Sequence, residues 1–294
     1  MSSQNLATSY DSLKDKWVDK NRAIQKSLWE RHFDALSYAQ SKIKHSTVST
    51  IGAFLLLVTP ISAAPHPQET NVSQNATLGA IAKNVFIISD LSHVLPSTVS
   101  PLSQSQENEV IHVISRDYNV SVQAQMQGIR LNQNYGYIGA EQHLARYPGD
   151  SVATHFSSQE DMDTYGASGM APGLSAWGYF ASDEADMTQI DSDREKWYIA
   201  VPTFLSPGYN ENTAQYNAFF KWRKMLVVNP QNGKAVVSVI GDSGPAPWTG
   251  KQLGGSPELM YYLDRVDGSD KGPVLYFFID DPSNTLPLGP LNEK

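Results

Sequence analysis

Short apolar runs dominate the chain from residue 109 onward. They are four to seven residues long, and their β-branched and aromatic side chains, bounded mostly by Gly, Pro, Asn or Asp, predict strands. The runs are 110–115, 118–122, 174–180, 197–201, 225–228, 235–240 and 274–279. Only 257–264 and 214–224 predict helices. Because strands do not alternate with helices, a doubly wound nucleotide-binding fold is not expected. We predict that 109–281 is a mainly β domain, a small barrel with long loops.

The main apolar run of the chain, residues 48–64, precedes this domain. Lys42, Lys44 and His45 lie just before it, and this cationic flank predicts that the amino terminus is cytoplasmic and the rest extracytoplasmic. The small residues up to Ala63 and the short length fit a cleaved signal peptide. A signal anchor also fits, at the lower limit of length for spanning a bilayer. We therefore expect a membrane segment at 46–64 and an exported carboxyl-terminal domain, which is membrane-anchored, or secreted if the signal is cleaved.

The segments on either side of this run have their own patterns. Residues 1–45 predict an amphipathic helix interleaved with basic side chains, which is either a surface helix or one that lies on the membrane or binds a cytoplasmic partner. Its apolar stripe consists of Leu13, Trp17, Ile24, Leu28 and Ala35. Residues 65–108, rich in Ser, Thr, Gln, Asn and Pro, predict an extended stalk with a short apolar segment at 81–88. Residues 282–294 are a tail.

The charge and composition of the chain exclude several classes of function. The 294 residues carry a net charge of −8 with a pI near 5.3. Nucleic acid is therefore not an expected partner, because neutralising phosphates needs a basic face. The absence of cysteine excludes disulfides, thiolate zinc sites, iron–sulfur clusters and a cysteine nucleophile. The sequence contains neither a phosphate-binding glycine loop nor a serine-nucleophile motif, and no cofactor is expected.

The most informative stretch is 226–245, which reads LVVNPQNGKAVVSVIGDSGP. Asn232-Gly233 predicts a hairpin turn between two strands. The second strand runs into Gly-Asp-Ser-Gly-Pro, and a helix opened by Ser256 follows. This stretch resembles the double-psi β-barrel of the rare-lipoprotein-A and expansin-like families. The resemblance covers about 174–264 and is strongest in 226–245. Upstream, 176–179 resembles the aromatic–glycine strand of those families, and 199–208 resembles a later strand with its turn.

The resemblance implies a role for the aspartate of the glycine–proline turn, which is Asp242 here. In those families this residue lies in an open groove and acts as acid or acid/base on a cell-wall polysaccharide. The chemistry is reasonable, because a carboxyl group beside apolar walls keeps its proton and can donate it to a glycosidic oxygen. The alternative is a turn residue that accepts backbone N–H bonds. Sugar rings would stack on the candidate substrate-binding aromatics, which are Trp177, Tyr179, Tyr209 and Trp248.

The chain also departs from the family pattern. Val201-Pro202 stands where bacterial members carry a histidine, and Ser243 follows the turn aspartate where arginine is frequent. The upstream glutamate of the family has no clear match, and Asp191 and Asp193 lie only near the expected distance. These departures keep open a non-catalytic, expansin-like module that binds glycan.

A second group of polar residues lies outside the resemblance, in 135–150. Glu141, His143, Arg146 and Asp150 fall within ten residues, and His155 follows soon after. Their spacing matches no known metal-ligand pattern, so no metal is predicted. The alternatives are a loop that bonds to the barrel, or a general base from His143 or His155 that completes the Asp242 site.

These observations lead to one functional hypothesis with two alternatives. We expect an exported bacterial cell-envelope protein with a double-psi-barrel-like domain that acts on wall polysaccharide, as a peptidoglycan lytic transglycosylase or a glycosidase-like enzyme. Its candidate catalytic residues are Asp242, Asp191 and His143. The first alternative is a non-catalytic module that binds cell-wall glycan. The second is a structural envelope protein whose amino-terminal helix recruits a cytoplasmic partner.

Overall fold

The computed structural model describes residues 84, 86–265 and 271–291. The predicted amphipathic helix at 1–45 and the predicted membrane segment at 46–64 lie outside these residues. Within the described ranges, none of the helices combines the length and the apolar character that crossing a membrane requires.

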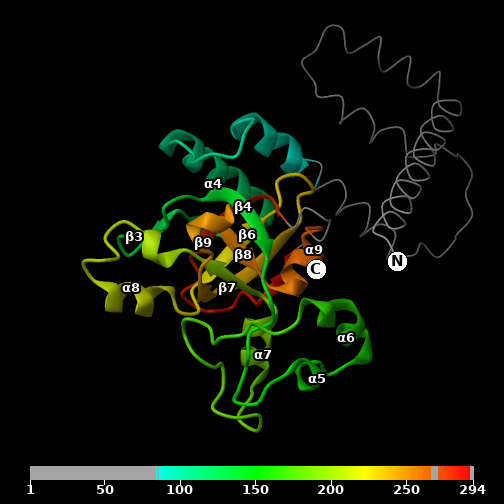
Figure 1. The fold of residues 1–294 in the computed structure, drawn as a ribbon. Helices are drawn as coiled ribbons and strands as arrows, with labels where there is room; N and C mark the ends of the chain where they lie inside the picture. The colour runs from blue at the N-terminus through cyan, green and yellow to red at the C-terminus, as the bar shows by residue number, and fades with distance from the viewer. Residues whose placement is uncertain (1–83, 85, 266–270, 292–294) are drawn as a thin grey trace, which may run out of the picture. The chain divides into compact units, whose positions relative to one another are not determined.

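Six strands form a closed barrel (Figure 1). They are β4 (Tyr135–Ala140), β5 (Tyr198–Val201), β6 (Lys224–Val228), β7 (Ala235–Ser243), β8 (Leu253–Gly255) and β9 (Lys271–Ile279). Around the ring the order is β4, β9, β6, β7, β5 and β8, and the pairing of β8 with β4 closes it. Two pairs, β4–β8 and β5–β7, are parallel, and the other four are antiparallel. The fold is therefore a mixed β-barrel, which confirms the predicted mainly β fold class and its small barrel.

The barrel interior is filled by side chains from every strand of the ring. The inward residues include Ile138, Ile199, Val201, Met225, Val227, Val236, Ile240, Leu253, Tyr276 and Phe278. Helix α8 (Thr213–Phe220) contributes two phenylalanines to this core, and α9 (Pro257–Tyr262) contributes Leu259 and Met260. Helices are present at both predicted places, 214–224 and 257–264, but α8 ends at Phe220 and Lys224 already belongs to β6.

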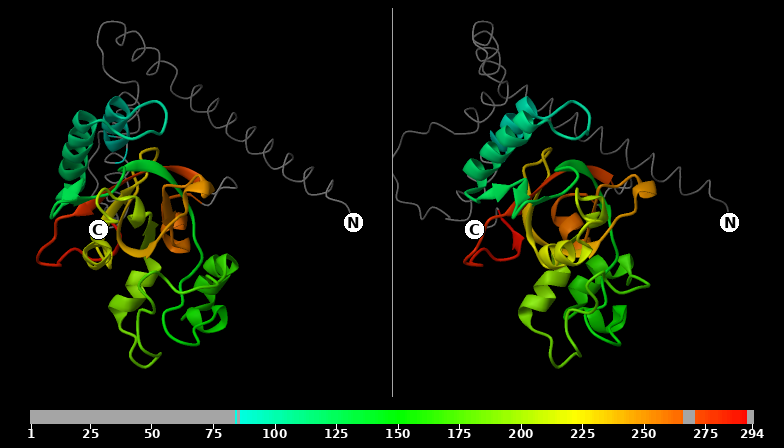
Figure 2. Two further views of the ribbon diagram at one scale, coloured as in Figure 1. Left: turned by 60° about the vertical axis from the view of Figure 1, so that its left-hand side comes forward. Right: turned by 90° about the vertical axis from the view of Figure 1, so that its left-hand side faces the viewer.

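A second core lies on the outer face of β6, β7 and β9. The outward residues Leu226, Val237 and Phe277 pack against α4 (Gln104–Tyr118) and a helical stretch at 86–94. Figure 2 shows these two segments, drawn in cyan and teal, together on one side of the barrel. Because both faces of these strands are buried, their sequences are continuously apolar rather than alternating.

Smaller elements complete the described chain. The short strand β1 (Val122–Gln123) pairs with β9, and β10 (Gly289–Pro290) pairs with β7. Strands β2 (Gln125–Met126) and β3 (Ile129–Arg130) form a separate hairpin.

Residues 141–196 form an insertion between β4 and β5. It contains α5 (Val152–His155), α6 (Gln159–Tyr165), the 3₁₀ turn η1 (Gly166–Ser168) and α7 (Gln189–Lys196). In Figures 1 and 2 the insertion lies below the barrel, and α4 lies above the barrel. Two further 3₁₀ turns are η2 (Thr203–Leu205) and η3 (Pro247–Thr249).

The strongest sequence signals located their elements correctly. The runs at 197–201, 225–228, 235–240 and 274–279 correspond to β5, β6, β7 and β9. Between β6 and β7, Gly233 adopts a positive φ of 69°, and the backbone N–H of Asn229 donates to Lys234 across the loop. The predicted hairpin is therefore present, with a six-residue connection between Val228 and Ala235.

Four predictions for the amino-terminal part and the 174–180 loop were wrong. The run 118–122 is not a strand, because Tyr118 ends α4, Asn119 caps it and only Val122 belongs to β1. The run 110–115 is not a strand but part of α4, which opens with a capping box between Ser103 and Gln106. Its apolar residues Val110, Val113 and Ile114 lie on one helical face, and the short window of β-branched residues hid this spacing. The described part of the predicted stalk, 86–108, contains helices packed on the barrel. Residues 174–180 form a loop with a single bridge between Ser175 and Gly178.

The packing of residues 86–94 on the barrel yields a test. The Ile87 side chain has 0% exposure, whereas its neighbour Phe86 is 60% exposed. We expect Ile87→Ala to lower the free energy of unfolding by about 2–5 kcal/mol, because it leaves a cavity in the outer core. Urea denaturation measures this loss, with Phe86→Ala as the matched control. Equal effects of the two substitutions would contradict the packing described above.

Candidate functional site

Asp242 lies near the end of β7, and an irregularity in strand pairing sets its orientation. Ile199 of β5 is opposite Ile240, but the next residue, Ala200, is opposite Asp242, so Gly241 is an extra residue in β7. Ile199 and Ile240 point into the barrel. The bulge therefore places the Asp242 side chain on the outer face, together with Ala200.

The Asp242 carboxyl group is half-buried and asymmetrically bonded. Its Oδ1 accepts hydrogen bonds from the backbone N–H groups of Ala176, at 2.6 Å, and Ser243, at 2.7 Å. Within the described chain, Oδ2 has no hydrogen-bond partner. Burial raises the pKa of Asp242 above its ordinary value, and the two backbone bonds only partly oppose this. Oδ1 therefore accepts the two backbone hydrogen bonds, and Oδ2 can carry a proton.

Glu141 is a second carboxylate on the same face, and the sequence interpretation did not assign it a role. Its side chain covers Gly254, where an added Cβ would lie 2.3 Å from Glu141 Oε1. Gly254 is paired with Ala200, which is paired with Asp242, so all three positions face the same side of adjacent strands. Two strand spacings, roughly 10 Å, separate the Gly254 and Asp242 backbones. Lys251 holds the Glu141 carboxylate at 2.8 Å.

The four candidate substrate-binding aromatics form two groups. Two of them are held by hydrogen bonds, and the other two are exposed to solvent. The Trp177 indole packs against the barrel core and donates its N–H to the carbonyl of Ile240. Tyr209 donates its hydroxyl to Asn217. By contrast, Tyr179 is exposed, and Trp248, on η3, is 88% exposed. Trp177 and Tyr179 belong to the loop that carries Ala176, the hydrogen-bond partner of Asp242.

The other two candidate catalytic residues lie in the insertion. Asp191 forms a capping box with Thr188 at the start of α7 and an ion pair with Arg194 at 3.2 Å. His143 is fully buried after β4. Among the described residues, neither forms a hydrogen bond or ion pair with Asp242. The structure therefore brings Asp242 together with Glu141 on one face, and places His143 in a separate cluster.

That separate cluster consists of His143, Arg146, Asp150, His155 and Glu195. Glu195 lies between the two histidines, with Oε2 at 3.0 Å from His155 Nε2 and Oε1 at 3.5 Å from His143 Nδ1. Asp150 bonds to His155 Nδ1 at 3.0 Å and to Arg146 at 2.9 Å. Although burial opposes both shifts, these contacts lower the pKa of Glu195 to about 2 and raise the pKa of His155 to about 9.

A cavity of about 330 Å³ adjoins the cluster, lined by His155, Glu195 and Glu258 among others. No sequence pattern pointed to Glu195, since it lies 40 residues from His155.

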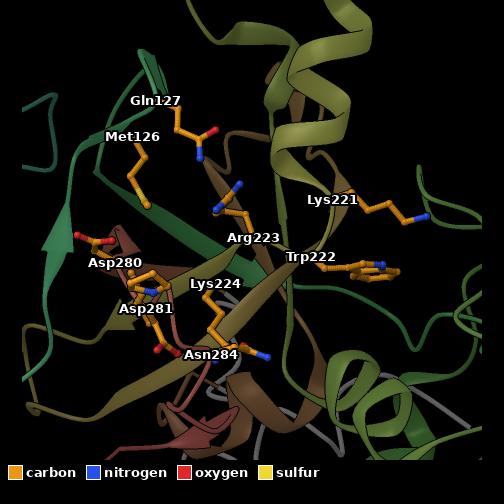
Figure 3. A pocket seen from close by; sticks show the side chains of 11 residues that line it. Met126, Gln127, Lys221, Trp222, Arg223, Lys224, Asp280, Asp281 and Asn284 are labelled. Carbon is orange, nitrogen blue, oxygen red and sulfur yellow. Dashed lines mark hydrogen bonds and ion pairs between the residues drawn. The ribbon is translucent and has the colours of Figure 1, made fainter.

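A larger cavity, of about 410 Å³, lies elsewhere on the barrel between the start of β6 and residues 279–284 (Figure 3). Most of the charged side chains that line this cavity are paired with neighbouring groups of the protein. Lys224 pairs with Asp281 at 2.8 Å, and the Arg223 guanidinium donates to the carbonyl of Phe219 and lies 4.4 Å from its ring centre. Figure 3 shows Lys221 and Trp222 turned away from Asp280 and Asp281. Asp242 lines neither of these two cavities.

The chain matches no protein-family model and no curated protein.

The bulge at Gly241 predicts a contrast between two glycines of the same turn. An added Cβ at Gly241 would lie 2.6 Å from Tyr198 Cβ, whereas at Gly244 the nearest atom, Ala200 Cβ, is 4.0 Å away. We expect Gly241→Ala to lower the free energy of unfolding by about 1–3 kcal/mol, because neither Cβ can move without the backbone. Gly244→Ala is the control and should change it little. Urea denaturation of both variants checks this, and equal stabilities would contradict the bulge.

Proposed function

We propose that this protein acts on a cell-wall polysaccharide at the cell envelope, as a glycosidase-like enzyme or lytic transglycosylase with Asp242 as the general acid. The observation that carries the proposal is the pair of carboxyl groups on one barrel face. Asp242 is half-buried with a raised pKa, and Glu141 is held beside Lys251. The wall glycan is the partner in this proposal, and anchoring or export through 46–64 brings the domain to it.

The two carboxyl groups differ in the way that glycosidic cleavage needs. A protonated Asp242 would donate its proton from Oδ2 to the glycosidic oxygen as the bond from that oxygen to the sugar carbon breaks. Positive charge then develops on the sugar ring. Glu141, which is ion-paired with Lys251, would stabilise that charge or take a proton from the attacking water or hydroxyl.

We also propose that the barrel is of the double-psi kind found in the rare-lipoprotein-A and expansin-like families. Support comes from the sequence resemblance in 226–245 and from the two parallel pairs, β4–β8 and β5–β7, in a ring of six strands. In this proposal the glycine–proline turn at Asp242 has the same role as in those families, and Glu141 takes the place of their unmatched glutamate.

Substitution of the acid tests the catalytic proposal. We expect Asp242→Asn to reduce the release of soluble fragments from purified wall sacculi by about 10²–10⁴-fold, because the amide cannot donate the required proton. Glu141→Gln should also reduce release while leaving sacculus binding intact. In the wild type, release should fall as the pH rises through the pKa of Asp242, since the acid must be protonated. Glu160→Gln, on the exposed surface of α6, is the control for a lost carboxylate.

A purely structural role of Asp242 would give a different result. Asp242→Asn would then cost about 1–2 kcal/mol of stability through weakened backbone bonds, with unchanged activity per folded molecule. That outcome, measured by thermal melting beside the release assay, would overturn the catalytic assignment.

The exposed tryptophan favours one second candidate, a non-catalytic module that binds glycan. A tryptophan that is 88% exposed provides a flat apolar surface on which a sugar ring can stack. We expect Trp248→Ala to weaken cosedimentation with sacculi by about tenfold, which corresponds to roughly 1.4 kcal/mol. Phe86→Ala, which removes another exposed aromatic ring, is the control. Binding without any release of fragments would favour this candidate over the enzyme.

A further inference from the structure

We propose that His143, His155 and Glu195 bind one divalent transition-metal ion, with zinc as the best-suited ion. This site is separate from the Asp242 face and does not depend on the polysaccharide proposal. All three residues are buried, and each offers one ligand atom, with these atoms within 4.8 Å of one another. Two imidazole nitrogens and a carboxylate are a ligand set that zinc accepts, leaving one position of a tetrahedron open.

The spacing of the ligand atoms fits a small ion. Glu195 Oε2 lies 3.0 Å from His155 Nε2, and Glu195 Oε1 lies 3.5 Å from His143 Nδ1. Ligand atoms about 2.0–2.1 Å from a tetrahedral zinc ion are themselves about 3.3–3.4 Å apart. The three ligand atoms lie within 4.8 Å of one another, and side-chain adjustments that draw them to the tetrahedral spacing would admit the ion.

Hydrogen bonds on the far side of each ring determine which nitrogen faces the centre of the cluster. His143 Nε2 lies 3.4 Å from the carbonyl of Tyr165, which can only accept, so a proton on Nε2 would leave Nδ1, the nitrogen that faces Glu195, able to ligate a metal. Nδ1 is buried and has no hydrogen-bond partner within the described part of the chain. Glu195 Oε1 lies 3.5 Å from this nitrogen, so the imidazole and the carboxylate are placed to ligate the same cation.

The surrounding residues hold the proposed ligands as outer-shell residues do in metal sites. Asp150 bonds to His155 Nδ1 at 3.0 Å, which turns Nε2 toward Glu195, and Arg146 in turn holds Asp150. The backbone N–H of Leu144 donates to Glu195 Oε1 at 3.0 Å. A carboxylate behind a ligating histidine fixes its tautomer and its orientation.

The open side of the site faces the 330 Å³ cavity, which is lined by His155, Glu195 and Glu258. Glu258, at the start of α9, is buried, and among the described residues its Oε2 has no hydrogen-bond partner. This oxygen is available to bond a water molecule on the fourth position of the metal. The ion would also join His143, just after β4, to Glu195, just before β5, and so close both ends of the insertion.

Metal analysis of the full chain tests the proposal. The protein, purified without a histidine tag and stripped with chelator, is dialysed against zinc sulfate and its zinc content is measured. We expect one bound zinc ion per chain, and at least about 100-fold weaker binding in His143→Gln and His155→Gln. Asp150→Asn, which removes only the outer-shell carboxylate, should weaken binding by about 10–100-fold. His112→Gln, on the exposed face of α4, is the control and should bind like the wild type.

Several results would overturn the site. They are a wild type that binds no zinc, a His143→Gln variant that binds as tightly as the wild type, or an equal loss in His112→Gln. If the histidine variants fail to fold by circular dichroism, cobalt(II) added to the wild type decides instead. A visible absorption band that zinc abolishes supports the site, and its absence overturns it. Because Asp242→Asn should bind zinc normally, failure here is distinguishable from failure of the polysaccharide proposal.

Discussion

Closure of the barrel depends on β8, a strand of only three residues between β4 and β5. Its two glycines make this contact feasible. A Cβ at Gly255 would lie 2.9–3.1 Å from side chains of the inner core, and one at Gly254 would collide with Glu141. Without side chains at these positions, β8 pairs with β4 in parallel and with β5 in antiparallel orientation. The same closure places Glu141 in line with Ala200 and Asp242, so the barrel and the candidate site share one constraint.

Local sequence determined some parts of this structure, and long-range register determined others. The β6–β7 hairpin was predictable, because two apolar runs flank a turn with Gly233 at its positive-φ position. Asp242 could be singled out because its glycine–proline turn continues one of these strands. Glu141 could not, because its proximity to Asp242 follows from pairing across three strands. The histidine–glutamate cluster was equally hidden, since its members come from a loop, α5 and α7, and no sequence spacing unites them.

The insertion 141–196 contributes to both candidate sites. Its first residue is Glu141, its 174–180 loop donates an N–H group to Asp242, and its two ends supply the buried histidine–glutamate cluster. A change in the packing of α5 or α7 would therefore reach the barrel face through the Ala176 bond as well as through Glu141. The barrel provides a rigid frame, and the insertion provides most of the polar chemistry.

The outer core has a consequence for how the domain can be divided. The outward side chains of β6, β7 and β9 are covered by α4 and residues 86–94. A fragment that began at the first strand would leave this broad apolar surface in water, and such surfaces self-associate. A fragment that lacks either helical segment is therefore expected to self-associate. A protease that cuts between α4 and β1 would separate this cover from the barrel and produce an aggregation-prone domain.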